Sequence, residues 1–139
     1  MQTALQPMER TLTQTDHARL TRLLARAGQP LPAAEAMRDM LDNSEVVPSP
    51  VVPSTVVTMY TQVLLEEQPG GTQLRLTLCY PPDVDPARGQ VSVLSPIGAA
   101  VLGLSVGETA RWRAPTGDER SARILSILFQ PEAAGDYLR

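Results

Sequence analysis

The spacing of hydrophobic residues divides the chain into a helical part and a strand-like part. Between residues 13 and 44, apolar positions recur every three or four residues, which predicts two short amphipathic helices. Thr13, followed three residues later by Asp16, is typical of a helix start, and Pro32 suits the first position of the second helix. The apolar stripe of the first helix consists of Leu20, Leu23, Leu24 and Ala27. The pattern therefore predicts a short helical hairpin.

A proline-rich segment separates the hairpin from the rest of the chain. Residues 46–53 read VVPSPVVP, and three prolines in eight residues exclude a helix. We interpret the segment either as an extended connection or as a short edge strand packed on the following sheet, and the sequence favours neither. The expected organisation is a hairpin over 1–45, a connection over 46–54 and a globular domain over 55–139.

From residue 55 onward, apolar and polar residues alternate, which predicts β-strands. The clearest strand spans 73–80, and a turn at 69–71 predicts that it pairs with a strand over 55–65. Two further strands are expected over 109–114 and 121–129. Together these segments predict a mainly antiparallel sheet.

The densest group of structural signals lies in the stretch 91–113. Ser95 is a favourable N-cap and Pro96 suits the first helical position, so a helix of barely two turns is expected to begin there. A helix this short is unstable alone and must pack against the sheet. Two chain reversals that need positive φ or a tight turn are assigned to Gly103, Gly107 and Glu108.

Composition and charge narrow the functions that the chain can have. Of its 139 residues, 12 are basic and 15 acidic, which gives a formal charge of −3 and disfavours direct nucleic-acid binding as the main activity. Every basic residue is arginine, so lysine Schiff-base chemistry and a P-loop lysine are excluded. Arg19, Arg22 and Arg26 share one helix face, which we interpret as a solvated face, with a contact surface as the alternative.

Isolated residues offer little further chemistry. Cys79 is the only cysteine, so it is interpreted as a buried apolar residue, and His17, the only histidine, as a structural residue. Asp83 and Asp85 are assigned to a turn, with a metal site as the weaker alternative. The sequence has no apolar run that would span a membrane and no secretory signal pattern at its start, so we expect a soluble cytoplasmic protein.

The stretch 95–108 resembles the C-terminal domain of the bacterial Gre transcript-cleavage factors. The residues that carry the resemblance are Ser95, Pro96, Ile97, Gly98, Ala100, Leu102, Gly103, Gly107 and Glu108. The tail at 130–138, QPEAAGDYL, is similar to that of the smaller Gre-like proteins that regulate nucleoside diphosphate kinase. The resemblance covers most of 56–139 and extends to the N-terminal third only in general layout.

The resemblance implies an α+β protein with an FKBP-like C-terminal domain, preceded by a truncated form of the Gre coiled coil. It implies RNA polymerase as the partner, at the rim of the secondary channel, in competition with Gre factors, and a link to regulation of nucleoside diphosphate kinase. Family membership also implies an association with DNA. A peptidyl-prolyl isomerase, or a general protein-interaction module, is the alternative.

The resemblance also assigns roles to residues of this chain. The residues implied in the polymerase contact are Ser95, Pro96, Ile97, Gly98 and Leu102. Gre factors use acidic residues at the tip of a long coiled coil to hold a metal ion for transcript cleavage. Here the residues at the tip of the hairpin are Gln29, Leu31 and Glu35, and a single acid would hold a metal poorly. We therefore expect no enzymatic activity, no catalytic residues, no metal and no cofactor.

Overall fold

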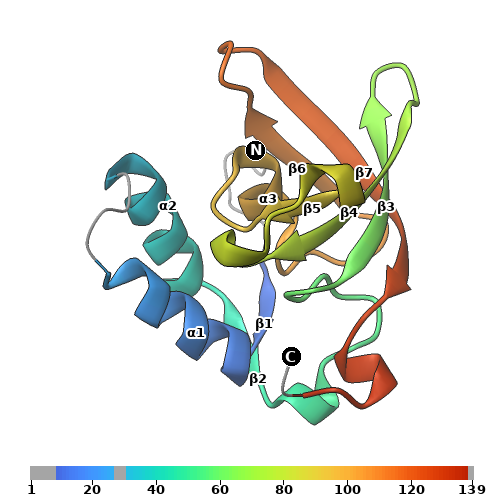
Figure 1. Ribbon diagram of the computed structural model, residues 1–139. Helices are drawn as coiled ribbons and strands as arrows, with labels where there is room; N and C mark the ends of the chain where they lie inside the picture. Colours follow the sequence, from blue (N-terminus) through green and yellow to red (C-terminus); the bar gives the residue numbers. More distant parts are fainter. Residues whose placement is uncertain (1–8, 27–30, 138–139) are drawn as a thin grey trace, which may run out of the picture.

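The computed structural model describes residues 9–26 and 31–137 and shows a five-stranded sheet, one short helix against it and a pair of helices beside them (Figure 1). The α+β prediction is confirmed. The helices are α1 (Gln14–Leu24), α2 (Leu31–Asp42) and α3 (Pro96–Val101). The strands of the large sheet are β3 (Gln62–Gln68), β4 (Gln73–Cys79), β5 (Gln90–Ser92), β6 (Thr109–Arg113) and β7 (Glu119–Phe129).

The large sheet has the strand order β5-β4-β3-β7-β6. The β3–β4, β3–β7 and β6–β7 pairs are antiparallel, as the alternation predicts. The β4–β5 pair is parallel, so the sheet is mixed. The parallel pairing arises because the chain leaves β4 through two 3₁₀ turns, η3 (Pro81–Asp83) and η4 (Pro86–Arg88), and returns to the end of the sheet at which β4 began.

The first predicted strand begins seven residues later than the sequence indicates, at Gln62 instead of residue 55. Residues 55–61 form an irregular segment in which four consecutive residues, 56–59, are all buried. Tyr60 has a φ of +65°, and the Thr61 hydroxyl accepts a hydrogen bond from the Thr58 backbone N–H at 3.0 Å. This local turn interrupts the strand, although the residues have high strand propensity.

The helical hairpin packs against the body of the protein and shares its hydrophobic core. Buried leucines of α1, together with Met37 and Leu41 of α2, belong to the same apolar cluster as the strands and α3. His17 bridges the two helices, with its Nε2 atom 3.2 Å from the Leu41 carbonyl oxygen. The buried Asp16 carboxylate accepts a hydrogen bond from the Met59 backbone N–H at 3.1 Å. The apolar faces of α1 and α2 are therefore used for packing on the sheet domain, and a free coiled coil is not supported.

A second, two-stranded sheet closes the base of the hairpin (Figure 1). Its strands are β1 (Thr11–Thr13) and β2 (Glu45–Val47), which pair in parallel. The strand β1 is absent from the sequence prediction, which assigns residues 1–45 to a helical hairpin. The proline-rich segment differs from both alternatives, because its first part belongs to β2, which pairs with β1 and not with the large sheet, and its second part contains a 3₁₀ turn, η2 (Ser49–Val51).

Candidate functional site

Helix α3 forms as its sequence predicts. The Ser95 hydroxyl oxygen accepts a hydrogen bond from the Gly98 N–H at 3.1 Å and donates one to the Ser92 carbonyl oxygen at 2.6 Å. Pro96 occupies the first helical position, where its missing N–H leaves no bond unmade. This N-cap fixes the turn that leads into the helix.

Gly98 has a packing role that the sequence analysis does not assign to it. A Cβ atom at this position would lie 2.1 Å from the Ser92 carbonyl oxygen, which is far inside van der Waals contact. The helix therefore sits directly on the turn before it, and only glycine permits that approach. A glycine in the first turn of a predicted helix is the one signal in the sequence that points to this packing.

Arg10 caps the other end of α3, a contact that the sequence analysis does not predict. Its Nη1 atom donates hydrogen bonds to the carbonyl oxygens of Ala99 at 2.8 Å, Ala100 at 3.3 Å and Leu102 at 2.8 Å. These are carbonyls that a helix end leaves without partners. Burial lowers the pKa of Arg10, and the negative charge of Glu108 acts in the opposite direction.

The two chain reversals after α3 match the predicted turns. Gly103 and Gly107 have φ angles of +81° and +94°. A Cβ at Gly103 would also lie 2.9 Å from the Arg10 Cβ, whereas a Cβ at Gly107 would meet no atom within 4 Å. The Glu108 carboxylate accepts a hydrogen bond from the Ser105 N–H at 2.6 Å and closes the second turn.

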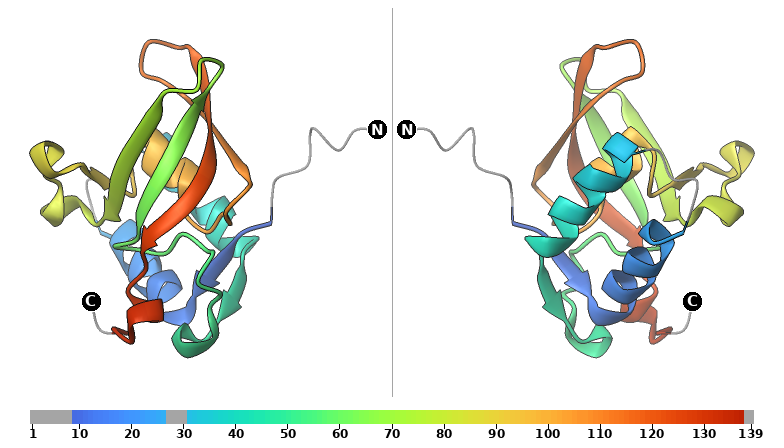
Figure 2. Two further views of the ribbon diagram at one scale, coloured as in Figure 1. Left: turned by 90° about the vertical axis from the view of Figure 1, so that its right-hand side faces the viewer. Right: turned by 90° about the vertical axis from the view of Figure 1, so that its left-hand side faces the viewer.

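A groove with a volume of about 550 Å³ lies between α2 and α3. The right-hand view of Figure 2 shows the ribbons of these two helices near each other. The apolar lining of the groove comes from residues of α2, including Met37 and Met40, and on the other side from Leu94, Pro96, Ala99 and Ala100. Arg10 lies within it, and two exposed arginines of β6, Arg111 and Arg113, stand at its edge. The groove thus combines an apolar floor with a cationic rim.

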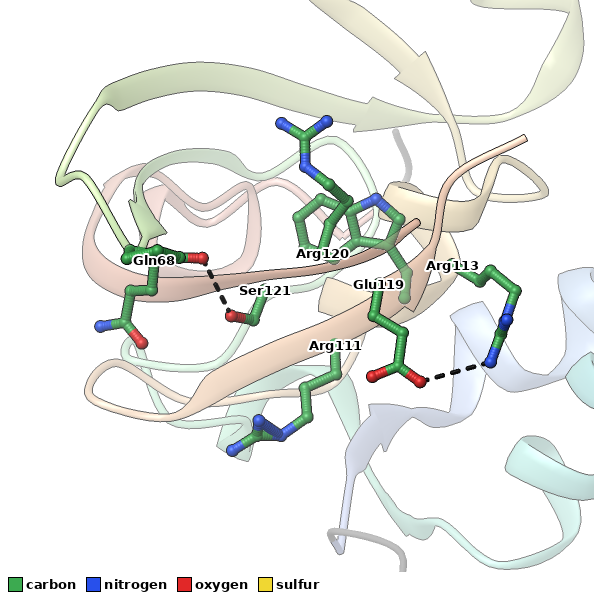
Figure 3. Close-up of a pocket in the computed structure, with 8 residues that line it drawn as sticks. Gln68, Arg111, Arg113, Glu119, Arg120 and Ser121 are labelled. Carbon is green, nitrogen blue, oxygen red and sulfur yellow. Dashed lines mark hydrogen bonds and ion pairs between the residues drawn. The ribbon is translucent and has the colours of Figure 1, made fainter. Parts of the chain in front are cut away.

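A second hollow of about 480 Å³ adjoins the groove and shares Arg111 and Arg113 with it (Figure 3). Arg113 pairs with Glu119 at 3.3 Å, between Nη2 and a carboxylate oxygen. The Ser121 hydroxyl donates to the Gln68 carbonyl oxygen at 3.4 Å. Arg111 extends away from these partners and has no carboxylate within ion-pair distance among the residues that the structure describes.

The structure separates the predicted polymerase-contact residues into two groups. Ser95 and Pro96 line the groove, and Ile97 is half-buried beside it. Gly98 and Leu102 are buried, and Leu102 is wholly inaccessible. Gly98 and Leu102 therefore support the groove from within this structure, whereas the other three residues are accessible at or beside it. Contact with polymerase stays a prediction for the whole set.

The tip of the hairpin offers little that bears on metal binding. Gln29 lies outside the described residues, Leu31 is the first residue of α2, and Glu35 is exposed on that helix. Within 9–26 and 31–137, His, Cys, Asp and Glu residues form no group of three or more that would hold a metal ion. Asp85 accepts a hydrogen bond from the Ala87 N–H within its own turn, whereas Asp83 accepts one from the Tyr60 hydroxyl, 23 residues away in the chain.

Two other predictions concern Cys79 and the membrane. Cys79 is fully buried in β4, with its sulfur 3.3 Å from the Val91 carbonyl oxygen, and burial raises the pKa of the thiol. Its interpretation as a buried apolar residue is confirmed. Among the described residues, every helix is too short or too polar to cross a bilayer.

Comparison with known proteins places this architecture in a family. The model of the C-terminal domain of transcription elongation factors GreA and GreB matches residues 52–129. The chain is 39% identical over 108 residues to the regulator of nucleoside diphosphate kinase of Escherichia coli (strain K12), a match that spans 78% of this chain and 79% of that protein. It is 31% identical over 91 residues to transcription elongation factor GreA of Bacillus anthracis (strain CDC 684 / NRRL 3495), which covers 66% of this chain and 57% of that factor.

Among solved structures, the fold is similar to a prokaryotic transcription elongation factor GreA/GreB from Nitrosomonas europaea. The superposition has a TM-score of 0.74, with 32% sequence identity, and covers 88% of this chain and all of the other. The matched family model includes the Ser95 cap, the glycine turns and the whole large sheet. The chain therefore belongs to the GreA/GreB family of transcription elongation factors.

Proposed function

We propose that this protein binds RNA polymerase at the rim of the secondary channel and regulates elongation without cleaving RNA. The observation that carries the proposal is the groove between α2 and α3, because it is lined by Ser95 and Pro96 of the family motif. The names of the relatives support a role in transcription elongation and a link to nucleoside diphosphate kinase regulation. We include both in the proposal.

The chemistry of the groove suits a protein ligand. Met37, Met40 and Pro96 offer an apolar surface into which a partner's hydrophobic side chain fits. Arg111 at the rim favours a partner that carries a carboxylate beside that anchor. None of the residues that line the groove is aromatic, which argues against the aromatic-lined pocket of a peptidyl-prolyl isomerase.

The hairpin supports the non-catalytic part of the proposal. Helices α1 and α2 have 11 and 12 residues, and each is about 17 Å long at 1.5 Å per residue. The residues between them, 25–30, read ARAGQP and include no acid. A carboxylate pair that would bind a metal at the tip is thus absent from the sequence there.

The first experiment measures binding to purified core polymerase by titration. We expect a dissociation constant in the micromolar range, about −8 kcal/mol. Pro96→Glu and Arg111→Glu should each weaken binding about tenfold, because one places a charge in the apolar groove and the other reverses the rim charge. Arg75→Glu is the matched control, since Arg75 is exposed on β4 and lies outside the groove.

The control variant should bind like the wild type, and all three variants should keep its far-ultraviolet circular dichroism. Unchanged affinity of both groove variants would show that the polymerase contact lies elsewhere on the surface. A wild-type protein that fails to bind core polymerase at all would remove the proposed function itself.

The second experiment tests chemistry and competition on a backtracked elongation complex. The protein alone should leave the transcript intact. At ten times its dissociation constant it should raise the concentration of a Gre factor needed for half-maximal cleavage about elevenfold, by competition at one site. Cleavage by this protein alone would contradict the non-catalytic assignment, and an unaltered Gre requirement would contradict the shared site.

A further inference from the structure

A cleft of about 350 Å³ lies between α1 and the turn that follows β4. It shares no lining residue with the groove between α2 and α3. We name it the arginine–tyrosine cleft, after the residues that dominate its two walls. Its polar and aromatic lining consists of Arg19, Arg22, Arg26, Tyr60, Tyr80 and Asp83. Figure 1 shows α1 below the turns from which the opposite wall comes.

The helical wall of the cleft is strongly cationic. Arg19 and Arg22 are three residues apart and lie along one face of α1, and Arg26, just beyond the end of that helix, lines the same cleft. Arg22 and Arg26 are exposed and have no carboxylate within ion-pair distance among the described parts of the chain. Asp83 is the one acid that lines the cleft. A chain with a net charge of −3 therefore concentrates positive charge at this site, which attracts anions.

The opposite wall offers planar apolar surface held in a fixed position. The Tyr60 and Tyr80 rings meet edge to face, with centroids 5.7 Å apart and an interplanar angle of 61°. Tyr60 is the only residue other than glycine with positive φ among those described, at +65°. Its hydroxyl donates to Asp83 at 2.5 Å, and its N–H donates to the Leu78 carbonyl oxygen at 2.6 Å.

The backbone of Tyr60 indicates that the position of its ring matters. A bulky residue in the left-handed region costs on the order of 1 kcal/mol or more and persists where the surrounding structure enforces it. Such residues gather at sites that bind ligands. Here the strained backbone places the Tyr60 ring in the lining of a cationic cleft. A ligand that uses both walls would carry an anionic part and a flat part.

The size of the cleft limits the ligand further. At about 350 Å³, it is at the lower end of small-molecule sites and accommodates about one nucleotide. Inorganic phosphate would use the arginines alone, and an acidic peptide would leave the tyrosine rings without a flat partner. Guanidinium groups bind phosphate oxygens in pairs, and nucleobases stack on tyrosine.

We infer that the arginine–tyrosine cleft binds a free nucleoside triphosphate, with its phosphates on Arg19, Arg22 and Arg26 and its base against Tyr60. The ligand would join α1 of the hairpin to the turn after β4 in the sheet domain. This inference is independent of the proposed function, because the groove and the cleft have no residue in common.

The test is isothermal titration of the full chain with ATP, GTP, tripolyphosphate and adenosine. At least one nucleotide should bind at least fivefold more tightly than tripolyphosphate, and adenosine should bind weakest, because phosphate and base both contribute. Arg22→Glu should weaken nucleotide binding about tenfold or more through charge reversal. Arg123→Glu is the matched control, since Arg123 is exposed on β7 and does not line the cleft.

A second variant separates the base contact from the phosphate contact. Tyr60→Asn removes the ring but keeps a residue that tolerates positive φ. It should reduce nucleotide affinity to that of tripolyphosphate and leave tripolyphosphate affinity unchanged. Thermal unfolding of each variant verifies that it is folded.

Three results would overturn the inference. Equal affinity for nucleotides and tripolyphosphate would show a site for phosphate only. Binding of a single-stranded RNA dodecamer at least tenfold tighter than any mononucleotide would show a polymer surface instead. No heat of binding with any nucleotide at millimolar concentration, together with no shift in thermal midpoint, would show that the cleft is not a nucleotide site.

Discussion

The packing of α3 on the turn before it yields a sharp prediction for Gly98→Ala. The new Cβ would lie 2.1 Å from the Ser92 carbonyl oxygen, and even a strained contact of 3.0 Å requires a displacement of about 0.9 Å, the difference between the two distances. That oxygen is held in place, because it accepts hydrogen bonds from the Ser95 N–H and hydroxyl. Displacing it costs about 3 kcal/mol, the usual upper range for overpacking.

Helix propensity acts in the opposite direction and is the smaller effect. Alanine is favoured over glycine in a helix by about 1 kcal/mol, which leaves a net loss of about 2 kcal/mol in the free energy of unfolding. For a chain of this length, 1 kcal/mol corresponds to roughly 3 to 4 °C, so the thermal midpoint should fall by about 6 to 8 °C.

The assay is thermal unfolding followed by circular dichroism, with Gly107→Ala as the control. Gly107 has positive φ but open space around it, so its variant reports backbone strain alone, about 1 kcal/mol. Gly103→Val would place a β-branched residue at a φ of +81° with its Cβ 2.9 Å from the Arg10 Cβ. The free energy of unfolding should therefore fall by at least roughly 1 to 3 kcal/mol. A thermal midpoint of Gly98→Ala equal to or above that of the wild type would refute the packing argument.

Three further predictions concern polar groups. Arg10→Met should destabilise the protein by about 2 to 3 kcal/mol in urea unfolding, because the carbonyls at the end of α3 lose a charged hydrogen-bond donor. A loss under about 0.5 kcal/mol would show that water replaces the guanidinium group as the donor. Ser95→Ala should cost about 1 kcal/mol in the same assay, and no change would contradict the cap. Burial and Glu132 raise the pKa of Asp16 from 3.8 to about 6, despite the Met59 N–H, so the folded state holds this proton more tightly. Stability should then fall as pH rises from about 4 to 6, by up to about 3 kcal/mol, and Asp16→Asn should flatten that slope; an equal slope in the variant would refute the assignment.

The sequence determines the elements whose signals are local. The Ser95 cap, the proline after it and the positive-φ glycines act within a few residues, so α3 and its turns can be predicted from the residues alone. The predictions of β4 and β7, whose residues alternate clearly between apolar and polar, agree with the structure for the same reason. The apolar stripes likewise predict both helices of the hairpin.

The family resemblance rests on the same local motifs, which is why the residues of 95–108 are sufficient to recognise it. These motifs do not show which residues elsewhere in the chain they contact. The sequence could therefore predict the polymerase-contact residues as one group, but not which of them are buried and which are exposed. The structure divides that set, because Leu102 is inaccessible in the core whereas Pro96 is exposed at the groove.

Only the tertiary structure decides the features that join residues distant in the chain. Arg10 meets the carbonyl oxygens of α3 about 90 residues away, and β1 forms only because Glu45–Val47 lies beside it. The 55–61 segment has the composition of a strand, but hydrogen bonds to Leu78 and Leu104 hold it in an irregular path. Local propensity contributes tenths of a kcal/mol per residue, roughly, and burial with long-range hydrogen bonds outweighs it. Both the groove and the arginine–tyrosine cleft lie between such distant segments, so neither could be located before the fold was known.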